Sequence, residues 1–179
     1  SLFQKICFWA GWASLVVALV SPLHPMGEVL FSAHMVQHEI LMLISAPLFV
    51  LSRPLVTFIW ALPLKSRRYL GQWSKASLVR GPWNFFTDPL TAWWTHAGAI
   101  WIWHIPFLFD RTLNSEPVHT AQHLSFFFSA LLFWWALLYA QSRRSYGAGV
   151  LYLFTTAVHT SILGALLTFA PRIWYSVYA

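Results

Sequence analysis

Long apolar runs constrain the fold of this chain more than any other feature. Each run is near the ~20 residues that a membrane-spanning helix needs. The five runs lie at residues 3–21, 33–51, 89–109, 118–139 and 149–169. Only 9% of the 179 residues are charged, against about 25% in ordinary soluble domains. The runs lack the alternation of a transmembrane β-barrel, so the sequence predicts a single all-α domain over residues 1–179, a polytopic membrane helix bundle with about five spanning helices.

Basic residues between the runs predict the orientation of the bundle. The two segments expected on one side hold Arg53, Lys65, Arg67, Arg68, Lys75, Arg80, Arg143 and Arg144. The two loops on the other side hold only Arg111. Because cytoplasmic loops carry an excess of Lys and Arg, we predict that the N-terminus is cytoplasmic and that Tyr178 lies outside.

The long segment between the second and third runs is predicted to lie along the inner membrane surface. Its apolar stretch, 55–64, has about half the length of a span, and Pro54 and Pro63 bracket it. Further apolar residues then recur at helical spacing among the basic ones: Leu64, Tyr69, Leu70, Trp73 and Leu78. This pattern is typical of an interfacial amphipathic helix on anionic lipid, and a disordered basic loop is the alternative.

Histidines gather near one edge of the predicted bundle. Two pairs, His34/His38 and His119/His123, share the pattern H-x-x-Q-H. Histidines four apart lie one above the other on a helix face, so both can bind one ion. His104 falls at the same predicted depth in a third helix. Because unpartnered polar rings are costly at membrane depth, we predict that the two pairs converge on one metal site near the outer face. We expect His104 either to join them as a fifth ligand or to hydrogen-bond beside them.

Three further histidines and Glu39 lie outside this predicted set of ligands. His96 and His159 lie deeper and are expected to be packed, hydrogen-bonded residues. His24 falls in a predicted outer loop, where it is either a surface residue or a ligand. Glu39 follows His38 directly, and it is either a proton carrier beside the site or a carboxylate at headgroup level.

The residues around the histidines favour copper over other ions. Imidazole suits copper, zinc, iron and nickel, whereas thioethers such as Met26 and Met42 select Cu(I). Gln37 and Gln122 are expected to hydrogen-bond the imidazoles and so fix their tautomers. The lone cysteine, Cys7, excludes an internal disulfide and a cysteine-rich metal site.

Three classes of function fit these residues. The first is a metal-binding protein without enzymatic activity. The second is a haem-binding membrane cytochrome or oxidoreductase, with His38 and His123, or His96 and His159, as axial ligands. The third is a chaperone whose histidines only hydrogen-bond. A hydrolase has little support because neither H-E-x-x-H nor G-x-S-x-G occurs, and no nucleic-acid partner is expected because the basic residues lie between spans.

Several motifs, taken together, resemble a known family. They are S-A-H-M-V-Q-H at 32–38, W-I-W-H-I-P at 101–106, V-H at 118–119, Q-H-L-S-F at 122–126, L-F-W-W at 132–135 and L-G-A-L-L-T at 163–168. The set is similar to the polytopic CtaG family, the assembly factors of caa-type cytochrome c oxidases, over nearly the whole chain. The resemblance implies a non-enzymatic, multi-pass protein of the bacterial plasma membrane.

The resemblance also implies a cargo and a partner. We expect a cytochrome c oxidase assembly factor that binds copper at the outer face and passes it to an oxidase subunit. Membrane lipid surrounds such a protein, and a homo-oligomer is left open. The family usually continues into a further C-terminal helix, and this chain begins without Met, so we expect either part of a longer protein or a shorter variant.

Overall fold

Helices make up most of the described chain, and no strand occurs in that part, as the apolar runs predict. The computed structural model describes residues 1–140, 146–172, 174, 175 and 178. Its helices are α1 Leu2–Leu19, α2 Leu23–Val29, α3 Phe31–Glu39, the π-helix η1 Ile40–Ser45, α4 Ala46–Ser52, α5 Pro54–Ala61, α6 Leu64–Trp73, α7 Ser77–Phe86, α8 Pro89–Trp103, α9 Pro106–Leu113, α10 Glu116–Trp135, the π-helix η2 Ala136–Ala140 and α11 Tyr146–Thr168. The predicted all-α bundle is confirmed.

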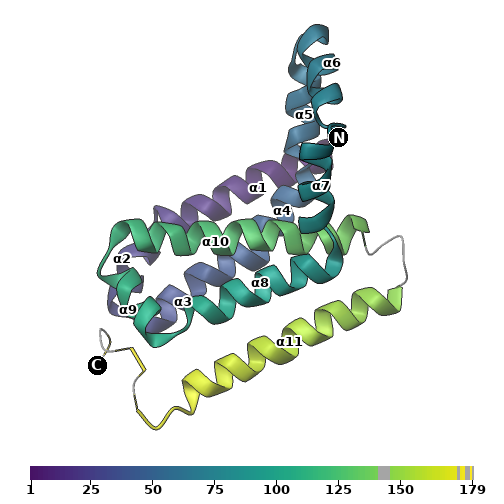
Figure 1. Ribbon diagram of the computed structural model, residues 1–179. Helices are drawn as coiled ribbons and strands as arrows, with labels where there is room; N and C mark the ends of the chain where they lie inside the picture. The colour runs from purple at the N-terminus through teal and green to yellow at the C-terminus, as the bar shows by residue number, and fades with distance from the viewer. Residues whose placement is uncertain (141–145, 173, 176–177, 179) are drawn as a thin grey trace.

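Four helical stretches are long and apolar enough to cross a membrane. They are Leu2–Val29, Phe31–Ala61, Glu116–Ala140 and Tyr146–Thr168. The fifth predicted run forms α8, which has 15 residues and lies lengthwise in the same bundle (Figure 1). It ends before 109 because Ile105 precedes Pro106, and the residue before a proline is disfavoured in helical conformation. The chain is a multi-pass membrane protein.

The bundle is built around α10. This helix packs against α8, α4 and η1, while α1 packs on α4 and η1. α11 reaches the bundle chiefly through α8, where Leu163 joins Ile100 and Phe126 in a buried apolar cluster. The two chain ends lie at opposite ends of the bundle (Figure 1).

An arm of three helices, α5 to α7, leaves the bundle at the end where the N-terminus lies (Figure 1). The chain turns into it at Arg53, whose left-handed backbone (φ 48°) separates α4 from α5. No residue of α5, α6 or α7 is buried, and the arm runs across the direction of α8 and α10. Its position along the inner membrane surface stays a prediction.

The opposite end of the bundle carries the predicted histidines. There α2, the start of α3, α9 and the start of α10 come together (Figure 1). Helix α2 occupies residues expected to form a loop, and it packs closely on α3.

Candidate metal centre

Four of the five predicted histidines meet in one place. His34, His38, His119 and His123, named here the histidine cluster, come from α3 and α10. Within each helix the ring centroids are 4.3 Å apart, as four-residue spacing predicts. Between the helices, His34 lies 5.2 Å from His119 and His38 lies 5.2 Å from His123. Two helical turns from separate helices therefore face each other ring to ring.

The donor atoms of this cluster are close enough for a shared ion. One ring nitrogen each of His34, His38 and His119 lies within 4.8 Å of the others. Nitrogens bound to one ion at ~2.0–2.1 Å are at most about 4 Å apart, so small side-chain movements bring all three into ligand positions. His123 adjoins this set through His119.

The cluster is desolvated, and its nitrogens lack partners. The four residues are 0–8% exposed. Among the described residues, no hydrogen-bond partner reaches either nitrogen of His34 or His38, or the Nε2 atoms of His119 and His123. A buried polar atom without a partner costs about 1–3 kcal/mol, and native proteins rarely tolerate several together. One nitrogen of each neutral imidazole has a lone pair, which is the kind of donor that copper, zinc, iron and nickel bind.

The two glutamines of the H-x-x-Q-H motifs play different parts. The Gln122 amide lies beside His34, but its own Nε2 and Oε1 atoms are buried without a partner in the described chain. Gln37 donates from Nε2 to the Ala18 carbonyl at 2.7 Å, and the same atom lies 3.0 Å from His24 Nδ1. Gln37 therefore orients His24 and not a member of its own pair.

His104 lies beside the cluster without entering its closest set. Its Nδ1 donates to the Ile100 carbonyl at 2.6 Å. Its ring is 6.2 Å from those of Phe109 and Phe126, which in turn contact His34 and His38 at 5.0 and 4.7 Å. His104 thus borders the phenylalanines that wall the site.

The deeper histidines have hydrogen-bond partners, as expected. His96 Nδ1 pairs with the Ser129 hydroxyl at 3.0 Å, and Trp101 donates to His159 Nδ1 at 3.3 Å. Glu39 is exposed, whereas its neighbour His38 points into the cluster.

Two described tyrosines after α11, Tyr175 and Tyr178, lie against the histidine end. Tyr175 is buried, stacks on Phe109 at 3.9 Å and donates to the His104 carbonyl at 3.1 Å. Tyr178 donates to the Gly27 carbonyl in α2. Burial, helped by the charge of Glu28, raises the pKa of Tyr178 to about 12, so its hydroxyl keeps its proton at neutral pH. The sequence signal for this contact is the group of aromatic residues near the C-terminal end, Trp174, Tyr175 and Tyr178.

The methionines are distributed unevenly around the site. Met42 is half-buried and packs against the cluster that contains Phe126, the ring that touches His38. Met26 is 48% exposed on α2. Met42 is therefore linked to the histidine cluster through Phe126.

The cluster geometry suits an ion better than a haem. A macrocycle held by His38 and His123 has to lie between their rings, whose centroids are 5.2 Å apart and edge to face. His34 and His119 stack beside them and fill the flanking space. The other proposed pair, His96 and His159, uses its Nδ1 atoms in hydrogen bonds with Ser129 and Trp101, and these contacts do not decide between haem and packing.

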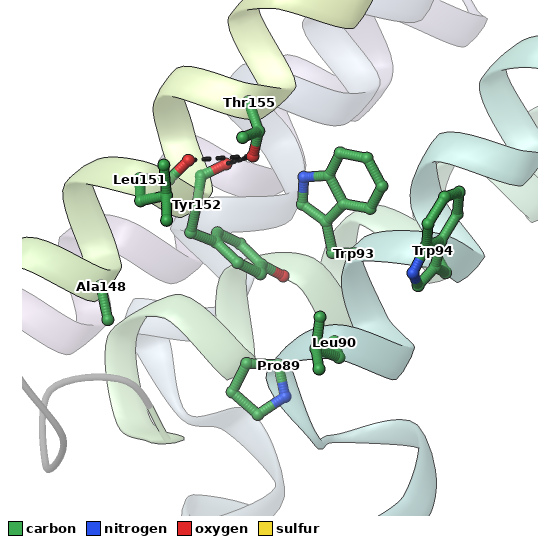
Figure 2. Close-up of a pocket in the computed structure, with 8 residues that line it drawn as sticks. All are labelled: Pro89, Leu90, Trp93, Trp94, Ala148, Leu151, Tyr152 and Thr155. Carbon is green, nitrogen blue, oxygen red and sulfur yellow. Dashed lines mark hydrogen bonds between the residues drawn. The ribbon is translucent and has the colours of Figure 1, made fainter.

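A hollow whose lining contains no histidine lies between α8 and α11 (Figure 2). Its volume is about 320 Å³. It is lined by Pro89, Leu90, Trp93, Trp94, Ala148, Leu151, Tyr152 and Thr155. The Thr155 hydroxyl is turned to the carbonyls of its own helix, so the walls are apolar and aromatic and offer no set of metal ligands.

His24, whose role the sequence left open, lies at the histidine end with two glutamates that the sequence did not single out. His24 and Glu28, one turn apart on α2, and Glu116, the first residue of α10, each have a ligand atom within 4.8 Å of the others. We call them the rim triad. The i, i+4 spacing of His24 and Glu28 was a usable signal, but it was hidden by the expectation of a loop.

Comparison with known proteins adds a family to this geometry. A family described as cytochrome c oxidase caa3 assembly factor matches residues 1–179. Two uncharacterized proteins, from Mycobacterium bovis and Mycobacterium tuberculosis, are each 26% identical over 98% of the chain. The chain spans 28% of the length of either relative. No solved structure matches.

Proposed function

The chain belongs to the cytochrome c oxidase caa3 assembly factor family, and from this premise we propose that it binds copper at the histidine cluster and passes it to an oxidase subunit. The observation that carries the proposal is the set of buried imidazole nitrogens without partners in the described chain. A structural role for these rings would be expected to pair them, as His96 and His159 are paired.

The donor set is suited to holding copper and releasing it again. Imidazole nitrogen is a donor that suits copper. Copper sites of oxidases use ligands of the same kinds, so transfer between the two proteins does not have to overcome a large difference in ligand preference. Two opposed pairs on α3 and α10 also let the ion be released stepwise, one histidine after another.

The proposed location is the outer face of the bacterial plasma membrane. The arm, which holds most of the basic residues, leaves the bundle at the end away from the histidine cluster, and Arg53 lies where it begins. Since an excess of Lys and Arg marks the cytoplasmic side, the end of the bundle with the histidine cluster faces outward in this proposal. The proposed role is binding and transfer of the ion, without a catalysed reaction.

Removing one histidine from each pair tests the proposal. In the double variant His38→Ala/His123→Ala we expect copper content to fall at least about tenfold and oxidase maturation to be lost, because each helix keeps only one donor. The measurements are metal analysis of protein purified from copper-replete cells and oxidase activity in the same cells. His159→Ala, outside the cluster, is the matched control and should keep both. A double variant with full copper content and a fully active oxidase would show that the histidine cluster only packs the helices.

An absorption spectrum distinguishes copper binding from the competing function, haem binding. Purified protein without a Soret band but with bound copper is expected. A Soret band that disappears in the double variant supports haem ligation instead.

A further inference from the structure

We propose that the rim triad, His24, Glu28 and Glu116, is a second cation site that captures a divalent metal ion before it enters the histidine cluster. The proposal deepens the copper-binding function proposed above and rests on it for the identity of the cargo. It stands on three features of the structure: the donor set, its contact with the cluster, and the orientation of His24.

The donor set brings two carboxylates and an imidazole together at the bundle end. Their ligand atoms lie within 4.8 Å of one another, with His24 half-buried and both glutamates exposed. Within the described ranges, no hydrogen bond or ion pair joins the three, and none links them to a Lys or Arg. The two carboxylates and the imidazole together offer oxygen and nitrogen donors within the reach of one divalent cation.

The rim triad is continuous with the histidine cluster. The His24 ring stacks on that of His119 with centroids 5.4 Å apart and planes 12° apart, and it lies 6.4 Å from His123. His119 is only 4% exposed, and its Nε2 has no partner in the described chain. An ion released by the carboxylates therefore meets an unpartnered imidazole next.

Gln37 determines which nitrogen of His24 can bind. The amide Nε2 of Gln37 contacts His24 Nδ1 at 3.0 Å while it donates to the Ala18 carbonyl, so Nδ1 accepts and the ring proton resides on Nε2. A cation bound at Nε2 displaces that proton to solvent, while Nδ1 continues to accept from Gln37.

The two sites differ in the chemistry of their ligands. Carboxylate and imidazole together suit a divalent ion such as Cu²⁺, whereas the histidine cluster offers imidazole alone. Passage from the rim triad to the cluster is an exchange of ligands: metal–oxygen bonds break as metal–nitrogen bonds form, and the ion keeps its charge. Exposed carboxylates also raise the local cation concentration, and such fields speed association by about 10–10³.

Copper(II) titration of the full chain in detergent tests the rim triad. We expect the unchanged chain to bind two Cu²⁺ and the variant Glu28→Gln/Glu116→Gln to bind one, with loading of the histidine cluster slowed by about tenfold. Asp110→Asn removes an acidic charge at the same end and is the matched control. His38→Ala/His123→Ala should retain the rim equivalent. Electron paramagnetic resonance distinguishes the mixed oxygen–nitrogen site from the all-nitrogen site.

The outcomes separate this proposal from the copper-binding function. If the glutamine variant binds and loads as the unchanged chain does, or if Asp110→Asn loses as much, there is no rim site and the histidine cluster is unaffected. If the unchanged chain binds a single Cu²⁺ that only the glutamine variant loses, the rim site stands and the function proposed for the cluster is overturned.

Discussion

At the scale of single residues, the four imidazoles of the histidine cluster are buried, although their nitrogens are polar and need partners. Each ring is surrounded by protein, with His34 fully buried and His123 only 8% exposed. In the described chain their rings contact each other, His24, Phe109 and Phe126. If the proposed metal binds here, it supplies these nitrogens with a partner, and we expect it to stabilise the fold around them.

The Trp134 side chain provides a hydrogen-bond donor to an irregular stretch of backbone in the bundle. The π-helix η1 leaves an irregular pattern of backbone hydrogen bonds, and the indole of Trp134 in α10 donates to the Met42 carbonyl at 2.8 Å. In Trp134→Phe that carbonyl loses its donor while most of the aromatic packing remains. We expect the free energy of unfolding to fall by about 1–3 kcal/mol, measured by denaturation in detergent.

The matched control for this change is Trp94→Phe. The Trp94 side chain is 67% exposed, so its loss should change unfolding by less than about 0.5 kcal/mol. Equal effects of the two substitutions would mean that the Met42 carbonyl does not depend on Trp134.

Residue-level prediction from the sequence reached the histidine pairs but not their neighbours. His34/His38 and His119/His123 follow from helical periodicity alone, which fixes the face that each pair shares. The partner of Gln37 does not follow from it, because the contact with His24 depends on how α2 folds back on α3.

At the scale of elements, α2 is the main departure from the predicted fold. Pro22, Pro25 and Gly27 are residues typical of loops, and they favoured an irregular connection. Proline is tolerated in the first turn of a helix, however, and Pro25 occupies that turn. Gly27 is buried where α2 meets α3, a tertiary contact that no local pattern indicates. The same limitation applied to α8, whose early end at Trp103 was marked only by Pro106.

Gly27 is where α2 approaches α3 most closely. A Cβ atom added there would lie 3.3 Å from the His34 Cα and 3.4 Å from the His34 nitrogen, both of them backbone atoms. In Gly27→Ala we therefore expect α2 to move away from α3, with a loss of about 1–3 kcal/mol in unfolding free energy. Because His24 is on α2, slower copper loading should accompany the loss.

Gly98→Ala in α8 is the control, since an added Cβ there meets nothing within 4 Å. Alanine favours the helix by up to about 1 kcal/mol over glycine, so this variant should be as stable as the unchanged chain or slightly more so. A Gly27→Ala protein with unchanged stability and loading rate would indicate that α2 adjusts freely, and that its spacing from α3 is not critical.

At the scale of the whole molecule, the separation of charge and histidines is the dominant asymmetry. The arm with Lys65, Arg67 and Arg68 lies at one end of the bundle, and the histidine cluster and rim triad lie at the other. The apolar runs and loop charges sufficed to predict this polarity, because both act over whole segments and do not depend on side-chain packing. The depth and pairing of individual rings required the packed structure.

The direction of this asymmetry across the membrane is the last prediction. Single cysteines are introduced in a Cys7→Ser background, which removes the one native thiol. Asn114→Cys, exposed beside α10 at the histidine end, should react with a membrane-impermeant maleimide on intact cells. Ser74→Cys, exposed after α6 in the arm, should react only after the cells are opened, because basic loops stay cytoplasmic. The reverse labelling pattern would mean that the histidine cluster opens toward the cytoplasm, and a copper donor acting at the outer face could not then use it.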